Sequence, residues 1–202
     1  MNRKGIFIAI EGIDAVGKKT QTSILNSWLR SRGLSTRALS FPVYETAIGK
    51  EIKKFLAGTV NYPPEARAML YAANRWETKA ELDSTLAETD ATLVNRYTGS
   101  NLAYGVSSGL ALDWLLNLEA GLPEPDVVLV LDAPPANLTP RRGGKDSYER
   151  NASLQTKARS AYLDLAARFG WTVVNADRGI DETSEAVKSA VSRTLEEGRK
   201  TV

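Results

Sequence analysis

The chain has 202 residues, of which 43% are hydrophobic and 25% are charged, proportions that suit one globular domain with a sizeable core. Its 26 basic and 24 acidic residues leave a formal net charge of +2, which argues against a nucleic-acid polymer as the main partner. The chain contains neither cysteine nor histidine, so disulfide frameworks, Cys/His zinc sites, thiol nucleophiles and histidine-based triads are excluded.

No stretch of the sequence is long and apolar enough for a membrane span, which needs about 18 or more apolar residues. The apolar run near the N-terminus, residues 6–10, is also too short for a signal peptide. We therefore expect a cytoplasmic protein with no membrane partner.

Residues 5–29 predict a strand, a loop and a helix in succession. The apolar residues 6–10 are β-prone, and the segment 20–32 places Ile24, Leu25, Trp28 and Leu29 on one helical face. Between them stands G-x-x-x-x-G-K, the core of the phosphate-binding P-loop, whose backbone N–H groups and lysine hold phosphates. The alternative is a merely structural glycine turn. The residues expected to bind nucleotide are Gly12, Ile13, Asp14, Ala15, Val16, Gly17, Lys18, Lys19 and Thr20.

One position in this loop departs from the P-loop pattern. A serine or threonine that ligates magnesium normally follows the lysine, but here Lys19 follows Lys18 and Thr20 comes next. An ammonium group does not ligate a cation. Either Thr20 ligates the metal from one place further along, or the metal is held through water and carboxylates while Lys19 adds positive charge.

The rest of the sequence alternates strands with helices. Strands are expected at 35–41, 91–94, 126–131 and 171–174, and helices at 47–56, 63–88, 148–169 and 182–197, with a further helix beginning near residue 100. Together with the first strand, this alternation predicts a three-layer α/β/α fold in which helices cover both faces of a five-stranded parallel sheet.

Several polar residues stand where a ligand site is possible. Tyr71 and Arg75 share a helical face, although spacing alone favours a core aromatic beside a surface arginine. Arg96 follows a strand, at the edge of the sheet where ligands gather in open α/β folds. The segment 140–146 combines three cations with two glycines, which is typical either of a mobile cationic loop or of a solvated turn.

Five stretches taken together resemble the thymidylate kinases, a family of P-loop nucleoside monophosphate kinases. They are IEGIDAVGKKTQ (10–21), FPVYETAIGKEI (41–52), NRYTGSNLAY (95–104), GLPEPDVVLVLD (121–132) and KDSYER (145–150). The resemblance implies one P-loop kinase domain over residues 1–202, with a lid around 139–150. It also implies transfer of the ATP γ-phosphoryl group to dTMP, with Mg²⁺ as cofactor and a homodimer as the assembly.

The resemblance carries roles onto the phosphate-binding residues. Lys18 would bridge toward the transferred phosphoryl group, and Asp14 would lie near the sugar 3′-hydroxyl and, with Thr20, near the metal. Arg96 would grip the acceptor phosphate. Ala15 stands where some family members have a charge-stabilising arginine, so the resemblance assigns that role to Arg141 or Arg142 in the lid.

The resemblance also assigns the acceptor nucleoside. Tyr71 would stack on thymine, and Arg75 would hydrogen-bond a base carbonyl. Ser100 and Asn101 would face the base, while Tyr104 would fill the space that a ribose 2′-hydroxyl needs.

The sequence departs from the family at Asn95 and Asn74, where aspartate is usual or frequent, and at Val43, where arginine is common. Asparagine keeps the shape of aspartate but binds magnesium less well. Two alternatives therefore stay open: a kinase of another, or of several, deoxynucleoside monophosphates, and a nucleotide-binding homologue that has lost catalysis. The apolar residues of segment 111–118 suit either a helical dimer interface or the core.

The assignment to the lid yields a first prediction. Replacing Arg141 and Arg142 together with alanine should lower turnover more than threefold, because it removes charge stabilisation in the transition state worth more than ~1 kcal/mol. Steady-state kinetics checks this. A double variant whose turnover stays within about threefold of the parent contradicts the assignment.

Overall fold

The computed structural model of the chain describes residues 5–138 and 151–199. One parallel sheet has the strand order β2-β3-β1-β4-β5. The strands are β1 (Ile6–Glu11), β2 (Thr36–Ser40), β3 (Ala91–Asn95), β4 (Val127–Asp132) and β5 (Thr172–Asn175). The helices are α1 (Lys18–Ser31), α2 (Ala47–Leu56), α3 (Pro64–Glu77), α4 (Lys79–Glu88), α5 (Thr98–Ser107), α6 (Leu112–Glu119), α7 (Ala152–Phe169) and α8 (Ile180–Arg199), with a 3-10 turn η1 (Pro135–Asn137) after β4.

Strand β1 lies at the centre of the sheet. It pairs with β3 on one side, where Ile8 is opposite Leu93, and with β4 on the other, where Ile8 is opposite Val127. The side chains of Phe7, Ile8 and Ile10 are fully buried, as expected for a strand covered on both faces. Because all strands are parallel, their carboxyl ends and the loops that follow them meet at one edge.

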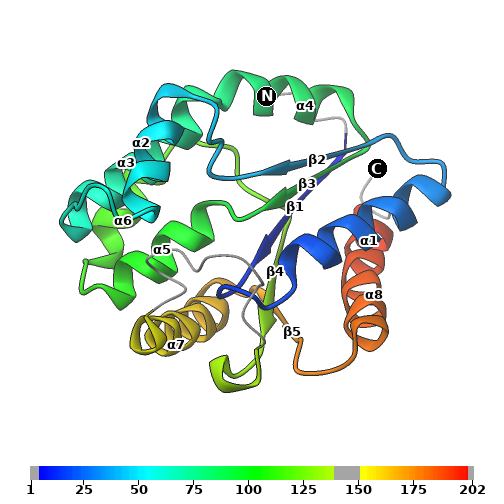
Figure 1. Cartoon of the computed structure of the whole chain (residues 1–202). Helices are drawn as coiled ribbons and strands as arrows, with labels where there is room; N and C mark the ends of the chain where they lie inside the picture. The colour runs from blue at the N-terminus through cyan, green and yellow to red at the C-terminus, as the bar shows by residue number, and fades with distance from the viewer. Residues whose placement is uncertain (1–4, 139–150, 200–202) are drawn as a thin grey trace.

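Helices cover both faces of the sheet, so the predicted three-layer arrangement is confirmed. Figure 1 shows α1 and α8 on one face and α5 and α7 on the opposite face. Leu25 and Leu29 of α1 are buried in the same core cluster as Val187 and Val191 of α8. Helices α2, α3 and α6 lie together beside α5, next to the carboxyl ends of the strands (Figure 1).

The helix expected over residues 63–88 is two helices, so that prediction is wrong. Helix α3 ends at Glu77 and α4 begins at Lys79. At the break, the hydroxyl of Thr78 donates hydrogen bonds to the carbonyl oxygens of Asn74 and Arg75, at 2.9 and 3.3 Å. Thr78 itself departs from helical backbone geometry, with φ of −107° and ψ of 8°, so the hydrogen-bond ladder of α3 stops there.

Other boundaries differ from the predictions by a few residues. Helix α7 begins at Ala152, where the side chain of Asn151 caps it by accepting a hydrogen bond from the backbone N–H of Leu154, at 3.0 Å. Residues 148–150 of the predicted helix lie outside the described residues. Strand β5 is shifted by one residue, and α8 begins at Ile180 rather than at Glu182. In the described part of the chain, no helix has both the length and the apolar character that crossing a membrane requires.

The turn after β1 depends on a glycine that lies against β4. Gly12 has φ of 132°, and a Cβ atom there would lie 2.5 Å from the carbonyl oxygen of Leu131. Backbone atoms cannot yield as a flexible side chain does, so both the torsion angle and the contact require glycine. Gly179 provides a contrast, because it has no positive φ and a Cβ atom there meets nothing within 4 Å.

We predict that Gly12→Ala lowers the free energy of unfolding by about 1–3 kcal/mol through backbone strain and the clash with β4. Gly179→Ala should leave stability unchanged or raise it slightly, by less than about 1 kcal/mol. Urea unfolding of both variants measures the difference. Equal stabilities for the two variants would contradict the proposed role of Gly12.

Candidate active site

The loop between β1 and α1 is built to surround an anion. Gly17 takes a left-handed conformation with φ of 96° directly before α1, so the positive end of the helix dipole faces the loop. The Lys18 ammonium is buried and donates to the carbonyl oxygens of Gly12 and Ile13, at 2.9 and 2.6 Å. The side chains of Lys19 and Thr20 are exposed in the first turn of α1.

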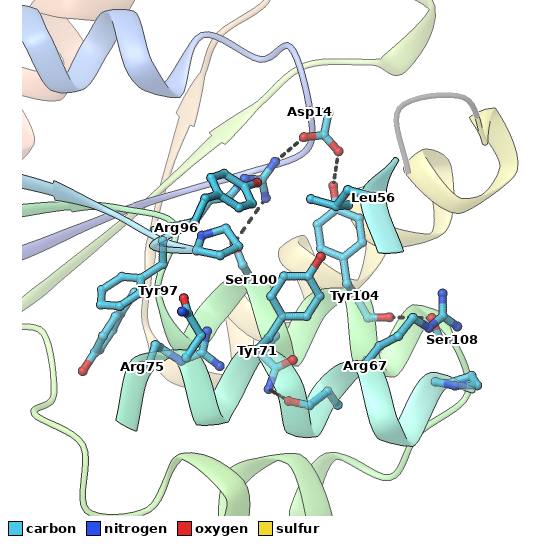
Figure 2. Close-up of a pocket in the computed structure, with 18 residues that line it drawn as sticks. Asp14, Leu56, Arg67, Tyr71, Arg75, Arg96, Tyr97, Ser100, Tyr104 and Ser108 are labelled. Atoms are coloured by element: carbon cyan, nitrogen blue, oxygen red, sulfur yellow. Dashed lines mark hydrogen bonds and ion pairs between the residues drawn. The ribbon is translucent and has the colours of Figure 1, made fainter. Parts of the chain in front are cut away.

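Asp14 connects this loop to three other parts of the chain. Its Oδ1 pairs with Nη2 of Arg96, and its Oδ2 accepts from the Tyr104 hydroxyl at 2.9 Å (Figure 2). Its Oδ2 also accepts from Nε2 of Gln155 at 2.9 Å. Burial alone would raise the pKa of Asp14, but the positive charges of Arg96 and Lys18 outweigh burial and lower it to about 2. Asp14 is therefore a carboxylate at any physiological pH.

Arg96 reaches Asp14 from a strained position. It follows β3 with φ of 62°, in the left-handed region that residues with a side chain seldom adopt. Its backbone N–H donates to the carbonyl oxygen of Ile10 at 3.0 Å, which ties the end of β3 to β1. Burial disfavours the cation, yet the charge of Asp14 holds the pKa of Arg96 well above its ordinary value. The guanidinium therefore stays charged between the loop and the start of α5.

Behind Asp14 and Arg96 lies a buried carboxylate that sequence reasoning missed. Glu11 is fully buried, and its two oxygens accept from the backbone N–H of Tyr97 at 2.7 Å and from the hydroxyls of Ser100 and Tyr162 at 2.6 and 3.2 Å. Burial and the charge of Glu11 together raise the pKa of Tyr162, which stays a neutral donor. An acidic residue that closes an apolar strand was the one signal that could have drawn attention to it.

All seven residues expected to bind the acceptor line a single pocket, together with Phe41 and Pro42. They are Asp14, Tyr71, Arg75, Arg96, Ser100, Asn101 and Tyr104. Figure 2 shows Tyr71 rising from α3 toward Tyr104, with Arg75 on the same helix. Arg141 and Arg142 lie outside the described residues.

Two of these side chains differ from the simplest expectation. Arg75 is only 3% exposed, so the interpretation of a surface arginine is wrong. Burial raises the pKa of Tyr104, and the charge of Asp14 raises it further, so its hydroxyl stays protonated and donates to Asp14. Gln155 of α7 also joins the site, and nothing in the sequence pattern had identified it.

The two asparagines that depart from the family have different surroundings. Oδ1 of Asn74 accepts from the backbone N–H of Val43 at 2.8 Å, while its Nδ2 lies 3.1 Å from the carbonyl oxygen of Val43 and 3.0 Å from Oγ1 of Thr46. An amide can both donate and accept here, whereas an ionised aspartate could only accept, so Asn74 holds the turn after β2. Oδ1 of Asn95, in contrast, is buried with no hydrogen-bond partner among the described residues.

Comparison with known proteins finds relatives over most of the chain. A family profile described as thymidylate kinase matches residues 10–187. The chain belongs to the thymidylate kinase family.

Individual relatives of this family match the chain nearly from end to end. The thymidylate kinase of Dictyostelium discoideum is 34% identical over 192 residues, which cover 94% of this chain and 86% of that protein. The probable thymidylate kinase of Thermococcus onnurineus (strain NA1) is 34% identical over 203 residues, covering 94% of this chain and 98% of that protein. The solved thymidylate kinase of Candida albicans, which is described as having broad substrate specificity, has a TM-score of 0.81 at 28% identity and covers 96% of this chain and 94% of that chain.

Membership of the thymidylate kinase family confirms the resemblance drawn from the sequence, and it makes the chain a nucleoside monophosphate kinase. The likeness to the Candida structure also confirms the three-layer fold. The comparisons support a thymidylate kinase rather than a kinase of another nucleotide or a silent homologue. The roles of the single residues stay predictions.

The lowered pKa of Asp14 predicts how stability depends on pH. Asp14 has a lower pKa in the folded protein than in the unfolded chain, so its ionised form stabilises the fold above about pH 4, by about 2 kcal/mol. That contribution is lost as the pH falls toward 2. Asp14→Asn lacks it, so the free energy of unfolding of the variant should fall less steeply over this range, measured by urea unfolding. Asp113→Asn, at an exposed carboxylate of α6, is the control, and parallel curves for the parent and Asp14→Asn would contradict the prediction.

Proposed function

We propose that the chain transfers the γ-phosphoryl group of ATP to dTMP, giving dTDP and ADP. The observation that carries this proposal is the pocket in which Asp14, Arg96 and the side chains of α3 and α5 meet beside the phosphate loop. An acceptor nucleotide in this pocket has its phosphate next to the loop that receives the donor. Holding the two phosphates together in this way supplies much of what phosphoryl transfer needs.

The donor phosphates occupy the loop of residues 12–20. Backbone N–H groups, the amino end of α1 and the ammonium of Lys18 supply positive charge. The carbonyl oxygens that hold Lys18 lie in the same loop, so the ammonium is already placed near the phosphates. The proposed reaction needs no dedicated general base, because phosphoryl transfer depends on positioning and electrostatics.

The acceptor phosphate binds Arg96. The ion pair with Asp14 and a hydrogen bond from Nη1 to the Ser100 hydroxyl, at 3.3 Å, hold the guanidinium in place. A fixed guanidinium makes strong, directional hydrogen bonds to phosphate oxygens. Arg141 and Arg142, in the lid segment 139–150, add charge stabilisation in the transition state.

The nucleoside lies deeper in the pocket. Tyr71 stacks on the base, and Tyr104 stands against the sugar with its hydroxyl fixed on Asp14 at 2.9 Å. A ring held in this way leaves no room for a 2′-hydroxyl, so the site accepts deoxyribose. Arg75 and Asn101 read the edge of the base.

Magnesium is the metal that fits this site. The exposed Thr20 hydroxyl, in the first turn of α1, and the partnerless Oδ1 of Asn95, at the carboxyl end of β3, are neutral oxygen donors. Such donors suit a cation that takes most of its ligands from phosphates and water. Both oxygens of Asp14 already accept hydrogen bonds from protein side chains. If Asp14 ligates the metal, as expected, it does so while also holding Arg96 in place. When bound, Mg²⁺ would neutralise charge that develops on the phosphate oxygens. In the part of the chain that the structure describes, no three acidic side chains converge on one point.

We also propose that the enzyme is a cytoplasmic homodimer. Met69 and Trp76 of α3 are 48% and 42% exposed, large fractions for apolar side chains. Helix α6 lies beside them, since Nε1 of Trp76 donates to the carbonyl oxygen of Leu118 at 3.2 Å. The face formed by α3 and α6 is therefore the surface that we propose for contact with a second copy.

An assay of ADP release across acceptors tests the proposed reaction. We expect the highest kcat/KM with dTMP, about 10-fold less with dUMP, which lacks one methyl group, and far less with dCMP, dGMP and AMP. Omitting Mg²⁺ should abolish turnover with all of them. A preference for any purine would overturn the assignment, and binding of ATP and dTMP by calorimetry without product would indicate a silent homologue.

A further inference from the structure

A second buried carboxylate lies behind the base end of the pocket. Glu119, the last residue of α6, is 8% exposed and is not among the residues that line the pocket. It nevertheless contacts two residues that do line it, Arg75 of α3 and Asn101 of α5. We propose that Glu119 is a positioning residue that sets which groups of Arg75 and Asn101 face the acceptor base. This inference deepens the proposed function and rests on it.

Glu119 fixes the plane of the Arg75 guanidinium. Its Oε2 accepts from Nε of Arg75 at 2.9 Å, and its Oε1 accepts from Nη2, so the pair is bidentate. This fork leaves Nη1 for the pocket, since no partner for it is recorded among the described residues. Arg75 therefore presents hydrogen-bond donors to the base in one fixed direction.

Glu119 also fixes the orientation of the Asn101 amide. Nδ2 of Asn101 donates to Oε1 of Glu119 at 2.6 Å and to the carbonyl oxygen of Ala68 at 3.2 Å. Both partners are acceptors only, so the amide must turn its NH₂ group toward them. Its carbonyl oxygen Oδ1 is left as an acceptor for the pocket.

Placing a carboxylate at the position of Glu119 costs free energy of folding, which argues that Glu119 does more than stabilise the fold. A carboxylate at the carboxyl end of a helix faces the negative end of the helix dipole, and burial removes it from water. Buried ion pairs are often no more stabilising than apolar residues of the same size. What the carboxylate adds, and an apolar residue cannot, is direction for two polar side chains.

The fixed directions select one base edge. A donor from Arg75 beside an acceptor on Asn101 complements a ring carbonyl next to a ring N–H, as in thymine or uracil. Cytosine offers an amino group next to an unprotonated ring nitrogen, so both contacts are reversed. A site built to hydrogen-bond one pattern rejects the reversed pattern strongly, because its buried groups are left unpaired.

The test is Glu119→Gln, which has almost the same shape but no charge, and whose NH₂ group can displace a donor of Arg75 or Asn101. We expect kcat/KM for dTMP to fall about 10- to 100-fold, chiefly through KM, with kcat changed by less than about threefold. The ratio of kcat/KM for dTMP over dCMP should fall at least 10-fold. Glu119→Asp, which keeps the charge on a shorter side chain, should give a ratio between those of Gln and the parent.

Asp83→Asn is the matched control, because Asp83 forms a partly buried ion pair with Lys79 at 2.6 Å and lines neither the pocket nor the loop. It should leave the dTMP/dCMP ratio unchanged. A purely structural role for Glu119 predicts equal losses for both acceptors, so a ratio within twofold of the parent overturns the inference. If Glu119→Gln does not fold in thermal unfolding, an unchanged ratio in folded Glu119→Asp overturns it equally. If the parent enzyme prefers dTMP but the variants lose activity equally on dTMP and dCMP, this inference fails and the proposed function stands. If the parent enzyme is inactive on dTMP, the proposed function fails as well.

Discussion

The ion pair between Asp14 and Arg96 is the interaction on which the rest of the site depends. It joins the loop after β1 to the loop after β3, across 82 residues of sequence. Lys18 and Arg96 both act on the pKa of Asp14, so two cations are held near one carboxylate before any phosphate arrives. Without Asp14 those cations would repel each other. The pair also fixes Arg96 in a backbone conformation that costs energy, which is the mark of a position set by function.

Buried carboxylates orient the polar groups of the pocket from behind. Glu11 in β1 accepts hydrogen bonds from the hydroxyls of Ser100 and Tyr162, and Glu119 in α6 accepts from Arg75 and Asn101. Each carboxylate has several donors, so the cost of burial is offset and the network is rigid. A substrate that enters such a pocket loses little free energy to the ordering of side chains, and this preorganisation is what in-line transfer requires.

Much of the fold and the loop could be predicted from the sequence because their causes are local. The apolar run of β1, the glycines of the loop and the amphipathic pattern of α1 all lie within 25 consecutive residues. The break at Thr78 was missed because residues 74–82 contain neither glycine nor proline, the usual sequence signals of a helix end. Glu119 was missed because its role depends on Arg75, which is 44 residues away in the sequence. Periodicity shows which face of a helix is apolar, but not which distant residue lies opposite a polar side chain.

The two asparagines show why a substitution within a motif has to be judged in its surroundings. Asn74 uses both its donor and its acceptor to hold the turn at Val43, so its neutral side chain is explained without reference to catalysis. Asn95 keeps a buried, partnerless oxygen at the carboxyl end of β3, and such an oxygen can serve as a ligand without adding negative charge. A carboxylate at residue 95 would have added negative charge directly beside Arg96. The neutral side chain leaves this edge of the sheet more positive. The positive potential favours the binding of two nucleotides with their phosphates close together.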